Sequence, residues 1–316
     1  MSLLDVRNLT LEIPTDRGLL TAVDNVSFSV EPGSVVGIVG ESGSGKSVTC
    51  NALVRLVPRG ARIRGSVIFD GRDILQATTR ELQAIRGGHI GYIFQDPMTN
   101  LNPSLTVGRQ ISETIIRHRG VTKKAARQRT IELLDMVGIP AAAKRADLYP
   151  HEFSGGMRQR ILIAMALSCD PKLLIADEPT TALDVTIQAQ ILDLLREMQK
   201  RFGMSIILVT HDFGVVADIC DHVAVFYGGE IVEQSPVDPV FSRPRHPYTK
   251  SLLGATERLP EKPLVMIPGM PPPLGEWPTG CRFAPRCSSQ FDACAVHPEL
   301  VGKVDDAVRC HLFGEG

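Results

Sequence analysis

The sequence predicts an α/β protein built around a parallel β-sheet, and three observations predict it. The 316 residues are 43% apolar, which suffices for one large domain with a substantial core and a small appendage. Residues 35–54 read as a short apolar strand, a glycine-rich loop and a helix. Residues 173–178 give a second apolar strand that ends in two acids, as expected at the carboxyl edge of a parallel sheet covered on both faces.

Composition excludes several classes of protein. Lys and Arg total 34 against 35 Asp and Glu, and this balance argues against nucleic acid as a partner. The N-terminal segment carries Asp5 and Arg7 where a secretory signal needs an unbroken apolar stretch, so we expect the chain to stay in the cytoplasm. No window approaches the roughly 18 to 20 uncharged apolar residues of a membrane-spanning helix. Any membrane association is therefore expected to go through a partner.

The first element in chain order is a phosphate-binding loop. A strand is predicted at Val35–Val39 and a helix from about Lys46, and the intervening "GESGSGKS" fits the pattern G-x-x-x-x-G-K-[ST]. The glycines allow backbone N–H groups to face an anion, and the helix N-terminus adds its dipole. Lys46 is expected to reach the β- and γ-phosphates and Ser47 to ligate Mg²⁺. The predicted nucleotide-binding residues here are Gly40, Glu41, Ser42, Gly43, Ser44, Gly45, Lys46, Ser47 and Val48.

A second nucleotide element follows in "KLLIADEPTTALD". The apolar strand Leu173–Ala176 ends in Asp177 and Glu178, whose side chains would face the ligand crevice of a parallel sheet. Asp177 is expected to hold Mg²⁺, directly or through water. Glu178 is expected to polarise the attacking water as general base.

The segment "FSGGMRQRILIAMALS" predicts a second anion site. Ser154 is placed to cap a helix that runs from about Met157, and Gly155 and Gly156 leave backbone N–H groups approachable. A simple P-loop kinase or GTPase does not need such a segment. One chain therefore carries two phosphate-binding surfaces.

Six motifs together resemble, in order and spacing, the nucleotide-binding cassette of ABC transporters. They are "GESGSGKS", "FQDPMT", "FSGGM", "LLIADE", "ALD" and "LVTHD", spread over roughly 200 residues. The resemblance implies a P-loop ABC ATPase core with an antiparallel β subdomain near the N-terminus and a helical subdomain at about 96–165. It also implies a head-to-tail dimer, in which the signature segment of one cassette closes on the ATP of the other.

Further roles follow only from this resemblance. Ser154, Gly155 and Gly156 would serve the γ-phosphate bound by the partner cassette. Gln95 would sense Mg²⁺ and the attacking water, His211 would contact the γ-phosphate in cis, and Asp184 would cross the dimer interface. The predicted catalytic set is Glu178, His211 and Gln95, and the predicted Mg²⁺ set is Ser47, Gln95 and Asp177.

The chain departs from the cassette pattern at three positions. Phe153 and Met157 replace Leu and Gln of the signature but preserve its Ser-Gly-Gly phosphate contact. The aromatic residue expected to stack on adenine upstream of the P-loop is missing from "TDRGLLTAVDNV". Stacking by an aliphatic side chain, Val23 or Leu20, is the alternative.

The end of the chain indicates which ABC protein this is. The segment "RPRHPYTKSLL" and the proline-rich stretch after it resemble the C-terminal extension of ATP-binding subunits from dipeptide and oligopeptide importers. This predicts a nucleotide-binding domain at 1–255 and an extension at 256–316. The implied function is ATP hydrolysis that drives peptide import.

The resemblance implies partners as well as a reaction. They are a second ATPase subunit, commonly a different one, two membrane permease subunits that dock on about 96–150, and indirectly an extracytoplasmic peptide-binding protein. The implied location is the cytoplasmic face of the cell membrane. Import of nickel chelates or glutathione, or a soluble ATPase regulating a macromolecular complex, remain alternatives.

Four cysteines gather in the extension, at Cys281, Cys287, Cys294 and Cys310, with gaps of five, six and fifteen residues. Disulfides are improbable in a reducing cytoplasm. A segment with too little apolar sequence for its own core suggests a cross-link, and the gaps leave a structural zinc and a larger cluster both open. The resemblance to importer subunits implies a [4Fe–4S] cluster on these four thiols, with zinc as the alternative.

Overall fold

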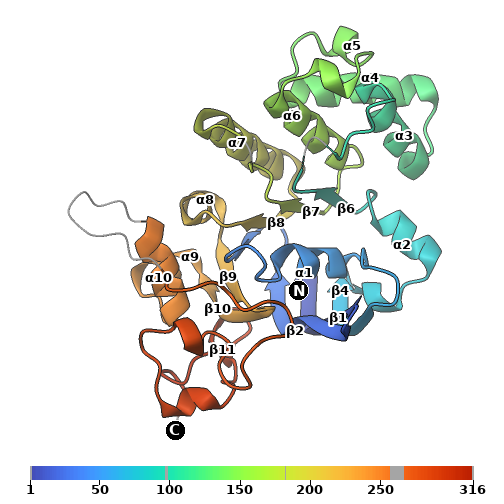
Figure 1. Ribbon diagram of the computed structural model, residues 1–316. Helices are drawn as coiled ribbons and strands as arrows, with labels where there is room; N and C mark the ends of the chain where they lie inside the picture. Colours follow the sequence, from blue (N-terminus) through green and yellow to red (C-terminus); the bar gives the residue numbers. More distant parts are fainter. Residues whose placement is uncertain (1, 97–98, 182, 257–266, 315–316) are drawn as a thin grey trace. The chain divides into compact units, whose positions relative to one another are not determined.

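The computed structural model describes residues 2–96, 99–181, 183–256 and 267–314 (Figure 1). The chain divides into two compact units. The first joins Met1–Gln76 to Val209–Gly316, and the second is Ala77–Leu208. The predicted boundary between residues 255 and 256 stays a prediction.

An antiparallel sheet of order β2-β1-β4-β5 opens the first unit. Its strands are β1 (Leu4–Thr15), β2 (Gly18–Val30), β4 (Arg62–Phe69) and β5 (Arg72–Asp73). Alternate residues of β1, including Leu4 and Val6, are fully buried, as one apolar face of a sheet requires. A register shift after Val6, with Asn8 at φ 50°, moves the next buried position to Leu9.

The other strands of the first unit are ordered β3-β9-β10-β12-β11. Strand β3 (Val35–Val39) pairs parallel with β9 (His222–Tyr227), and β10 (Glu230–Pro236) pairs antiparallel with β9. All five residues of β3 are buried, which fits the predicted strand and the continuous apolar run of a parallel sheet. Helix α1 (Lys46–Leu53) follows β3, and the 3-10 turn η1 (Ile74–Gln76) follows β5.

The C-terminal part of the chain folds onto this sheet rather than standing apart from it. The strand β12 pairs with β10 and with β11, and the segment lies alongside α10 and β10 (orange to red in Figure 1). The elements of this part are α8 (Phe213–Ile219), α9 (Val237–Ser242), α10 (Pro247–Thr256), η3 (Ala284–Arg286), η4 (Asp292–Ala295), β11 (Val301–Lys303) and β12 (Asp306–Val308).

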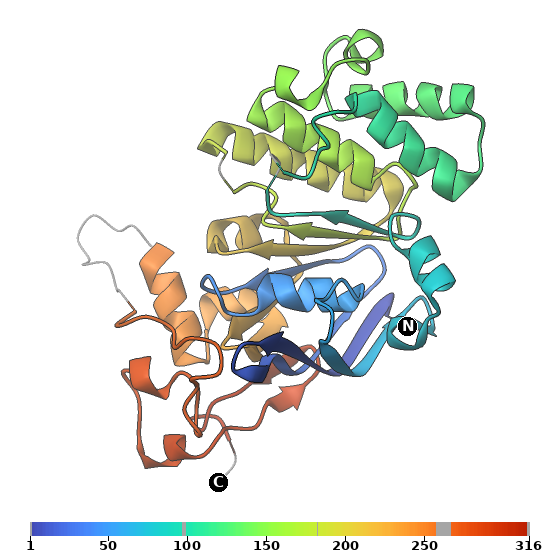
Figure 2. The same ribbon diagram turned by 45° about the vertical axis from the view of Figure 1, so that its right-hand side comes forward.

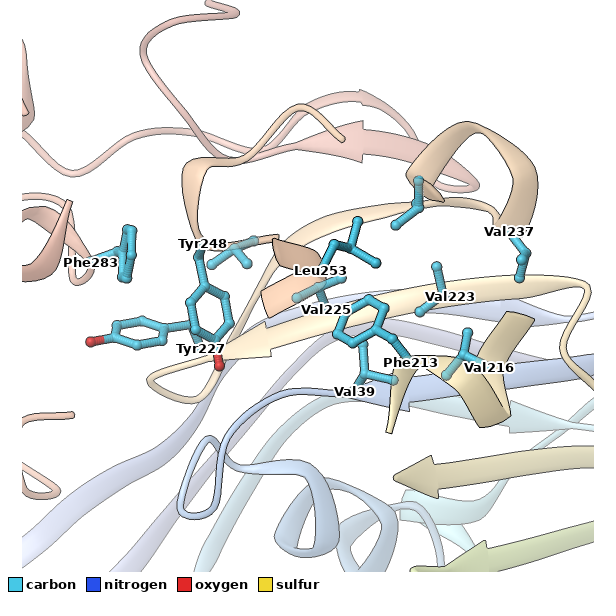
Figure 3. Packing of buried hydrophobic residues seen from close by; sticks show 12 residues of the cluster. Val39, Phe213, Val216, Val223, Val225, Tyr227, Val237, Tyr248, Leu253 and Phe283 are labelled. Carbon is cyan, nitrogen blue, oxygen red and sulfur yellow. The ribbon is translucent and has the colours of Figure 1, made fainter. Parts of the chain in front are cut away.

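An aromatic cluster fixes this C-terminal part to the unit's core. The ring centroid of Tyr227 lies 4.8 Å from that of Tyr248, and Phe283 lies 5.2 Å from each (Figure 3). Tyr227 ends β9, Tyr248 lies in the first turn of α10, and Phe283 belongs to the extension, so three distant segments share one apolar cluster. Burial of these rings supplies the extension with a core that its own sequence lacks.

The second unit combines parallel strands with capped helices. Strand β6 (Ile90–Ile93) pairs parallel with β7 (Leu173–Asp177), and β8 (Ser205–Thr210) begins here and ends in the first unit. Helices α3, α4 and α6 pack on one another (green in Figure 2). The helical elements are α2 (Thr79–Ile85), α3 (Val107–Arg119), α4 (Lys123–Met136), α5 (Ala142–Arg145), η2 (Pro150–Glu152), α6 (Gly155–Ala166) and α7 (Val185–Phe202).

Side-chain caps set where most of these helices begin. Thr78, Thr106, Thr122, Ser154 and Asp184 each accept a hydrogen bond from a backbone N–H in the first turn of the helix that follows. Capping satisfies donors that the helix itself leaves open. Among the residues the structure describes, no helix has the length and apolar character needed to cross a bilayer.

Candidate functional site

The glycine-rich loop joins β3 to α1 in a conformation that only glycine fits at its two ends. Gly40 has φ 152°, and a Cβ added there would lie 2.3 Å from the carbonyl oxygen of Phe226. Gly45 caps α1 at φ 102°, and its Cβ would approach Gly229 Cα at 3.0 Å. The loop is therefore shaped by β9 and the turn after it, and not only by its own residues.

The polar groups of this loop suit a phosphate chain. Lys46 Nζ, 4% exposed, donates to the carbonyl oxygens of Gly40 at 2.7 Å and Glu41 at 2.9 Å, so its ammonium group lies across the loop. The Ser44 hydroxyl is buried and has no hydrogen-bond partner among the described atoms. Ser47 and Val48 lie in the first turn of α1, where N–H groups point toward the N-terminal end of the helix. A lysine and backbone N–H groups around a glycine turn bind anions.

A second cluster of predicted residues forms at the carboxyl edge of β6 and β7 in the second unit. Asp177 ends β7 and is 4% exposed, and Glu178 follows it. Glu178 Oε2 accepts one hydrogen bond from Gln95 Nε2 at 2.9 Å and one from Thr181 Oγ1 at 2.9 Å. Gln95 and Glu178 meet because β6 and β7 run parallel and both end at this edge.

Glu178 also has an unusual backbone. Its φ is 47°, in the left-handed region that non-glycine residues rarely adopt and that costs of order 1–3 kcal/mol. Strain of this size persists where the surrounding structure requires a side chain in one place. Here it turns the carboxylate of Glu178 toward Gln95.

The predicted signature segment lies at the start of α6. Ser154 is exposed, and its hydroxyl accepts from Met157 N at 3.4 Å as the N-cap. Gly155 is exposed and meets only Leu183 within 4 Å, at 3.8 Å, whereas Gly156 faces Ile187. The segment thus presents the N-terminal end of a 12-residue helix at the surface of its unit.

Asp184 and His211 both lie just before a helix. One carboxylate oxygen of Asp184 accepts from Ile187 N at 3.0 Å and caps α7. The next residue, Val185, is 83% exposed, an unusual position for a large apolar side chain. His211 follows β8 and is exposed, and the neighbouring Asp212 caps α8.

The predicted residues are therefore distributed over both units. The P-loop residues and His211 belong to the first unit, whereas Gln95, Asp177, Glu178, Asp184 and the signature segment belong to the second. The structure brings Gln95 and Glu178 into contact. That all of these residues serve one kind of ATP site stays a prediction.

The predicted metal centre in the extension is wrong. In the described ranges, no group of three or more His, Cys, Asp or Glu side chains is arranged to hold a metal ion, which contradicts both the [4Fe–4S] cluster and the zinc alternative. Metal ligation needs thiolates. Burial raises the pKa of Cys281 to about 11 and raises the pKa of Cys287 and Cys310 as well, which favours the thiol form of these side chains in the metal-free chain.

Three of the four cysteines pack instead as small apolar side chains. Cys281 and Cys287 pack against the cluster of Tyr227, Tyr248 and Phe283, and Cys294 is buried. The backbone N–H of Cys281 donates to the carbonyl of Cys294 at 2.9 Å. The expected cross-link is unnecessary because the extension borrows the core of the first unit.

The adenine-stacking candidates differ in exposure. Val23 is fully buried and offers no surface to a base. Leu20 is half-buried and contacts the extension, since a Cβ added to Gly275 would lie 2.9 Å from Leu20 Cδ2. The extension thus lies beside the stretch where the aromatic residue was expected.

Sequence reasoning missed two residues that contact the P-loop. Arg286 pairs with the carboxylate of Glu41, and the Tyr248 hydroxyl accepts a hydrogen bond from the backbone N–H of Glu41 at 2.8 Å. Tyr248 belongs to the His-Pro-Tyr triplet and Arg286 lies between two of the cysteines. The triplet indicated a family, but nothing local in the sequence pointed to Glu41 as its partner.

Comparisons with known proteins agree with this geometry. The family model described as "ABC transporter" matches residues 23–181, and the model described as "Oligopeptide/dipeptide transporter, C-terminal region" matches residues 232–294. Among solved structures, the dimeric MJ0796 ATP-binding cassette bound to ADP and Pi shares 30% identity at a TM-score of 0.66. That match covers 74% of this chain and 98% of the cassette.

Curated relatives match over nearly the full length. The Bacillus subtilis protein named "Oligopeptide transport ATP-binding protein OppD" is 52% identical, covering 90% of this chain and 81% of the relative. The Haemophilus influenzae protein of the same name is 50% identical, covering 94% of this chain and 93% of the relative. With its P-loop ABC ATPase fold, the chain belongs to the ABC transporter family and is one of that family's ATP-hydrolysing proteins.

Proposed function

We propose that the chain is the ATP-hydrolysing subunit that powers import of dipeptides or oligopeptides through an ABC transporter. The observation that carries this proposal is identity of 50–52% to proteins named for oligopeptide transport, over 90% or more of this chain. The match of residues 232–294 to the C-terminal region of oligopeptide and dipeptide transporters supports the same substrate class. Nothing comparable favours nickel chelates, glutathione or a soluble regulatory role.

The residues of the two clusters have complementary roles in this proposal. Residues 40–48 wrap the phosphates, with Lys46 neutralising the β- and γ-phosphates. Ser47, Gln95 and Asp177 would hold Mg²⁺, which would offset the negative charge of the phosphates. Glu178 takes a proton from the attacking water, and the hydrogen bond from Gln95 at 2.9 Å orients the Glu178 carboxylate for that task.

The remaining predicted residues support a composite site between two cassettes. Ser154, Gly155 and Gly156 are positioned as an exposed helix N-terminus that could bind the phosphate held by another subunit. The exposed Val185 beside Asp184 suits a contact that is covered in a dimer. The related MJ0796 cassette is described as dimeric. In this scheme His211 contacts the γ-phosphate of the ATP that its own P-loop binds.

The proposed assembly places this chain at the cytoplasmic face of the membrane as a peripheral subunit. It pairs with a second ATPase subunit, commonly of a different sequence, and docks through about 96–150 on two permease subunits. An extracytoplasmic binding protein delivers the peptide. In this scheme residues 1–255 form the nucleotide-binding domain with its helical subdomain at 96–165, and residues 256–316 form a small cysteine-bearing extension.

The test is reconstitution of this chain with its permease and ATPase partners in vesicles. We expect Mg-ATP enclosed on the cytoplasmic side to drive accumulation of a labelled oligopeptide, and a transporter carrying Glu178→Gln to bind ATP without accumulation. Accumulation of a nickel chelate or glutathione, with no oligopeptide uptake, would contradict the substrate class. ATP turnover stimulated by nucleic acid or ribosomes and independent of permeases would contradict the transport function.

A further inference from the structure

The C-terminal extension holds the second residue of the P-loop. Arg286 Nη1 donates to Glu41 Oε2 at 2.6 Å and Arg286 Nη2 donates to Glu41 Oε1 at 3.0 Å, so two N–H groups engage both carboxylate oxygens. The Arg286 side chain is 4% exposed and that of Glu41 is 26% exposed. A bidentate, largely dry pair of this kind is directional and stronger than a surface ion pair.

The guanidinium of Arg286 is also held by contacts other than the one with Glu41. Its Nε donates to the carbonyl of Pro268 at 2.9 Å and its Nη2 also donates to the carbonyl of Gly269 at 3.2 Å. The group lies 5.8 Å from the ring centroid of Tyr227, within cation–π range. Arg286 therefore has one orientation, which directs its outer N–H groups at the P-loop.

A second contact holds the backbone of Glu41. The amide of Glu41 donates to the Tyr248 hydroxyl at 2.8 Å, and Tyr248 is fully buried in the aromatic cluster with Tyr227 and Phe283 (Figure 3). Both the main chain and the side chain of Glu41 are thus bound by residues from 248–286. Glu41 in turn helps to position Lys46, because the Lys46 ammonium donates to the carbonyl oxygen of Glu41 at 2.9 Å.

The charge of Glu41 gives this contact a consequence for nucleotide. A carboxylate in a loop that binds a polyphosphate repels the ligand, and this repulsion is stronger than in bulk water because the effective dielectric constant near a protein is lower. Arg286 neutralises the carboxylate and turns it toward the extension. An unpaired Glu41 would both weaken phosphate binding and release the loop.

We propose that Arg286 is a positioning residue for the P-loop, and that the C-terminal extension is thereby part of the machinery that binds nucleotide in the same chain. This inference rests on the proposed function, because it assumes that the loop binds ATP. Coupling between two sites is reciprocal, so nucleotide bound at the P-loop must also alter the extension.

The fluorescence of a tryptophan in the extension can be used to follow this coupling. Trp277 is the only tryptophan in the sequence. Its ring centroid lies 6.2 Å from that of Tyr227, and the Arg282 guanidinium lies 5.9 Å from the Trp277 ring. Intrinsic fluorescence of the full chain therefore reports the surroundings of Arg286 without a label.

The experiment measures binding of Mg-AMP-PNP to the full chain by calorimetry and by Trp277 fluorescence. We expect saturable quenching or enhancement in the wild type, a Kd raised about tenfold in Arg286→Ala, and an intermediate Kd in Arg286→Lys, whose ammonium cannot bind both carboxylate oxygens. Arg245→Ala is the matched control, since Arg245 ties the extension to β10 through Asp306 and Glu233 but does not touch the P-loop. Its Kd should stay within twofold of wild type.

A double variant separates positioning from mere stability. Arg286→Ala combined with Glu41→Gln removes the unpaired charge but does not restore the contact, so its Kd for Mg-AMP-PNP should lie between those of Arg286→Ala and the wild type, whereas a loss caused by misfolding would not be relieved at all. If Arg286→Ala does not fold, Tyr248→Phe tests the same claim through the Glu41 amide and should raise the Kd severalfold. Folded variants with wild-type Kd, or full rescue by Glu41→Gln, would overturn the inference, because the first result would leave Arg286 without a role and the second would leave it a role through charge alone. Absence of binding by the wild-type chain would overturn the proposed function together with it.

Discussion

The P-loop and the signature segment are both serine- and glycine-containing turns at the start of a helix, but they are held in different ways. The P-loop is fixed from outside, by Arg286 on Glu41 and by the carbonyl of Phe226 against Gly40. The exposed end of the signature segment is fixed mainly by the Ser154 hydroxyl on Met157 N, with Gly156 packed against Ile187 of the neighbouring helix α7.

This difference separates two demands on a phosphate site. A loop that wraps its own ligand must be shaped on all sides, and distant parts of the fold supply that shape. A helix end that serves a ligand on another subunit must stay exposed, so its outermost residues, Ser154 and Gly155, rest mainly on their own turn. The predictions below run from the largest expected effect to the smallest, and those on the P-loop, its support and the signature segment test this contrast.

The largest effect is expected from removing the base while leaving both segments intact. Glu178→Gln keeps the shape of the side chain but cannot accept a proton, so steady-state ATP turnover of the assembled complex should fall by about 10²–10⁴-fold with nucleotide affinity unchanged. Glu197→Gln, an exposed substitution on α7, is the matched control and should leave turnover unchanged. Near wild-type turnover in Glu178→Gln would remove Glu178 from this role.

Matched glycine substitutions address the contrast itself. Gly40→Ala should lower the free energy of unfolding by about 3 kcal/mol, since its Cβ would lie 2.3 Å from the Phe226 carbonyl at a φ that alanine resists. Gly155→Ala should raise it by roughly 0.5 kcal/mol, because alanine favours the helix and meets only Leu183 at 3.8 Å. Chemical denaturation of the full chain measures both.

The two glycine substitutions are expected to change the free energy of unfolding in opposite directions, and this difference in sign is what tests the contrast. Gly155→Ala should also impair turnover of the assembled complex, despite its greater stability, because the added methyl group crowds the partner's phosphate. Equal destabilisation by the two substitutions would contradict the view that the signature segment stands free.

Acid should loosen the support behind the P-loop through His246. Burial is the main cause that lowers the pKa of His246 to about 3, and its Nδ1 accepts from Tyr248 N at 3.0 Å. Between pH 6.5 and 3 the unfolded chain binds a proton at this residue and the folded chain does not, so stability falls as pH falls through that window. The loss from pH 7 to pH 4.5 should be roughly 2–3 kcal/mol.

The comparison variant for this prediction is His246→Asn, whose side-chain oxygen can accept from the same N–H and does not titrate. Unfolding free energies of both proteins at pH 7 and pH 4.5 give the contribution of His246 by difference. Equal pH dependence in the two proteins would show that His246 is not the group responsible.

The smallest effect is expected at the signature cap. Ser154→Ala removes one N-cap acceptor and should cost about 1 kcal/mol of unfolding free energy. Binding of Mg-AMP-PNP to the isolated chain should not change, because the P-loop does not rest on this segment. A weakened Kd in the isolated chain would show that the two segments are not independent.

The sequence predicted the parts of the molecule that local pattern controls. The strands at Val35–Val39 and Leu173–Ala176 agree with β3 and with all but the last residue of β7, and the helix expected near Lys46 begins there. The helix expected from about Met157 begins two residues earlier, at Gly155. Apolar runs and glycine spacing decide these elements, and both are visible in a short window.

The parts that depend on distant packing were not predictable in the same way. The cysteines suggested a metal centre because the extension looks too poor in apolar residues to fold, and the sequence does not reveal that Tyr227 and Tyr248 lend it a core. The pair of Glu41 and Arg286 joins residues 245 positions apart. Nothing in the local sequence around either residue predicts a contact with the other.

Amide hydrogen exchange of the full chain without nucleotide tests the central contrast most directly. Comparison of wild type with Arg286→Ala should show exchange in peptides covering residues 40–48 accelerated by about tenfold, since the extension no longer holds the loop closed. Peptides covering residues 154–160 should exchange at the same rate in both proteins. Unchanged exchange in the P-loop, or equal acceleration in both segments, would contradict the claim that the extension holds the P-loop while the signature segment holds itself.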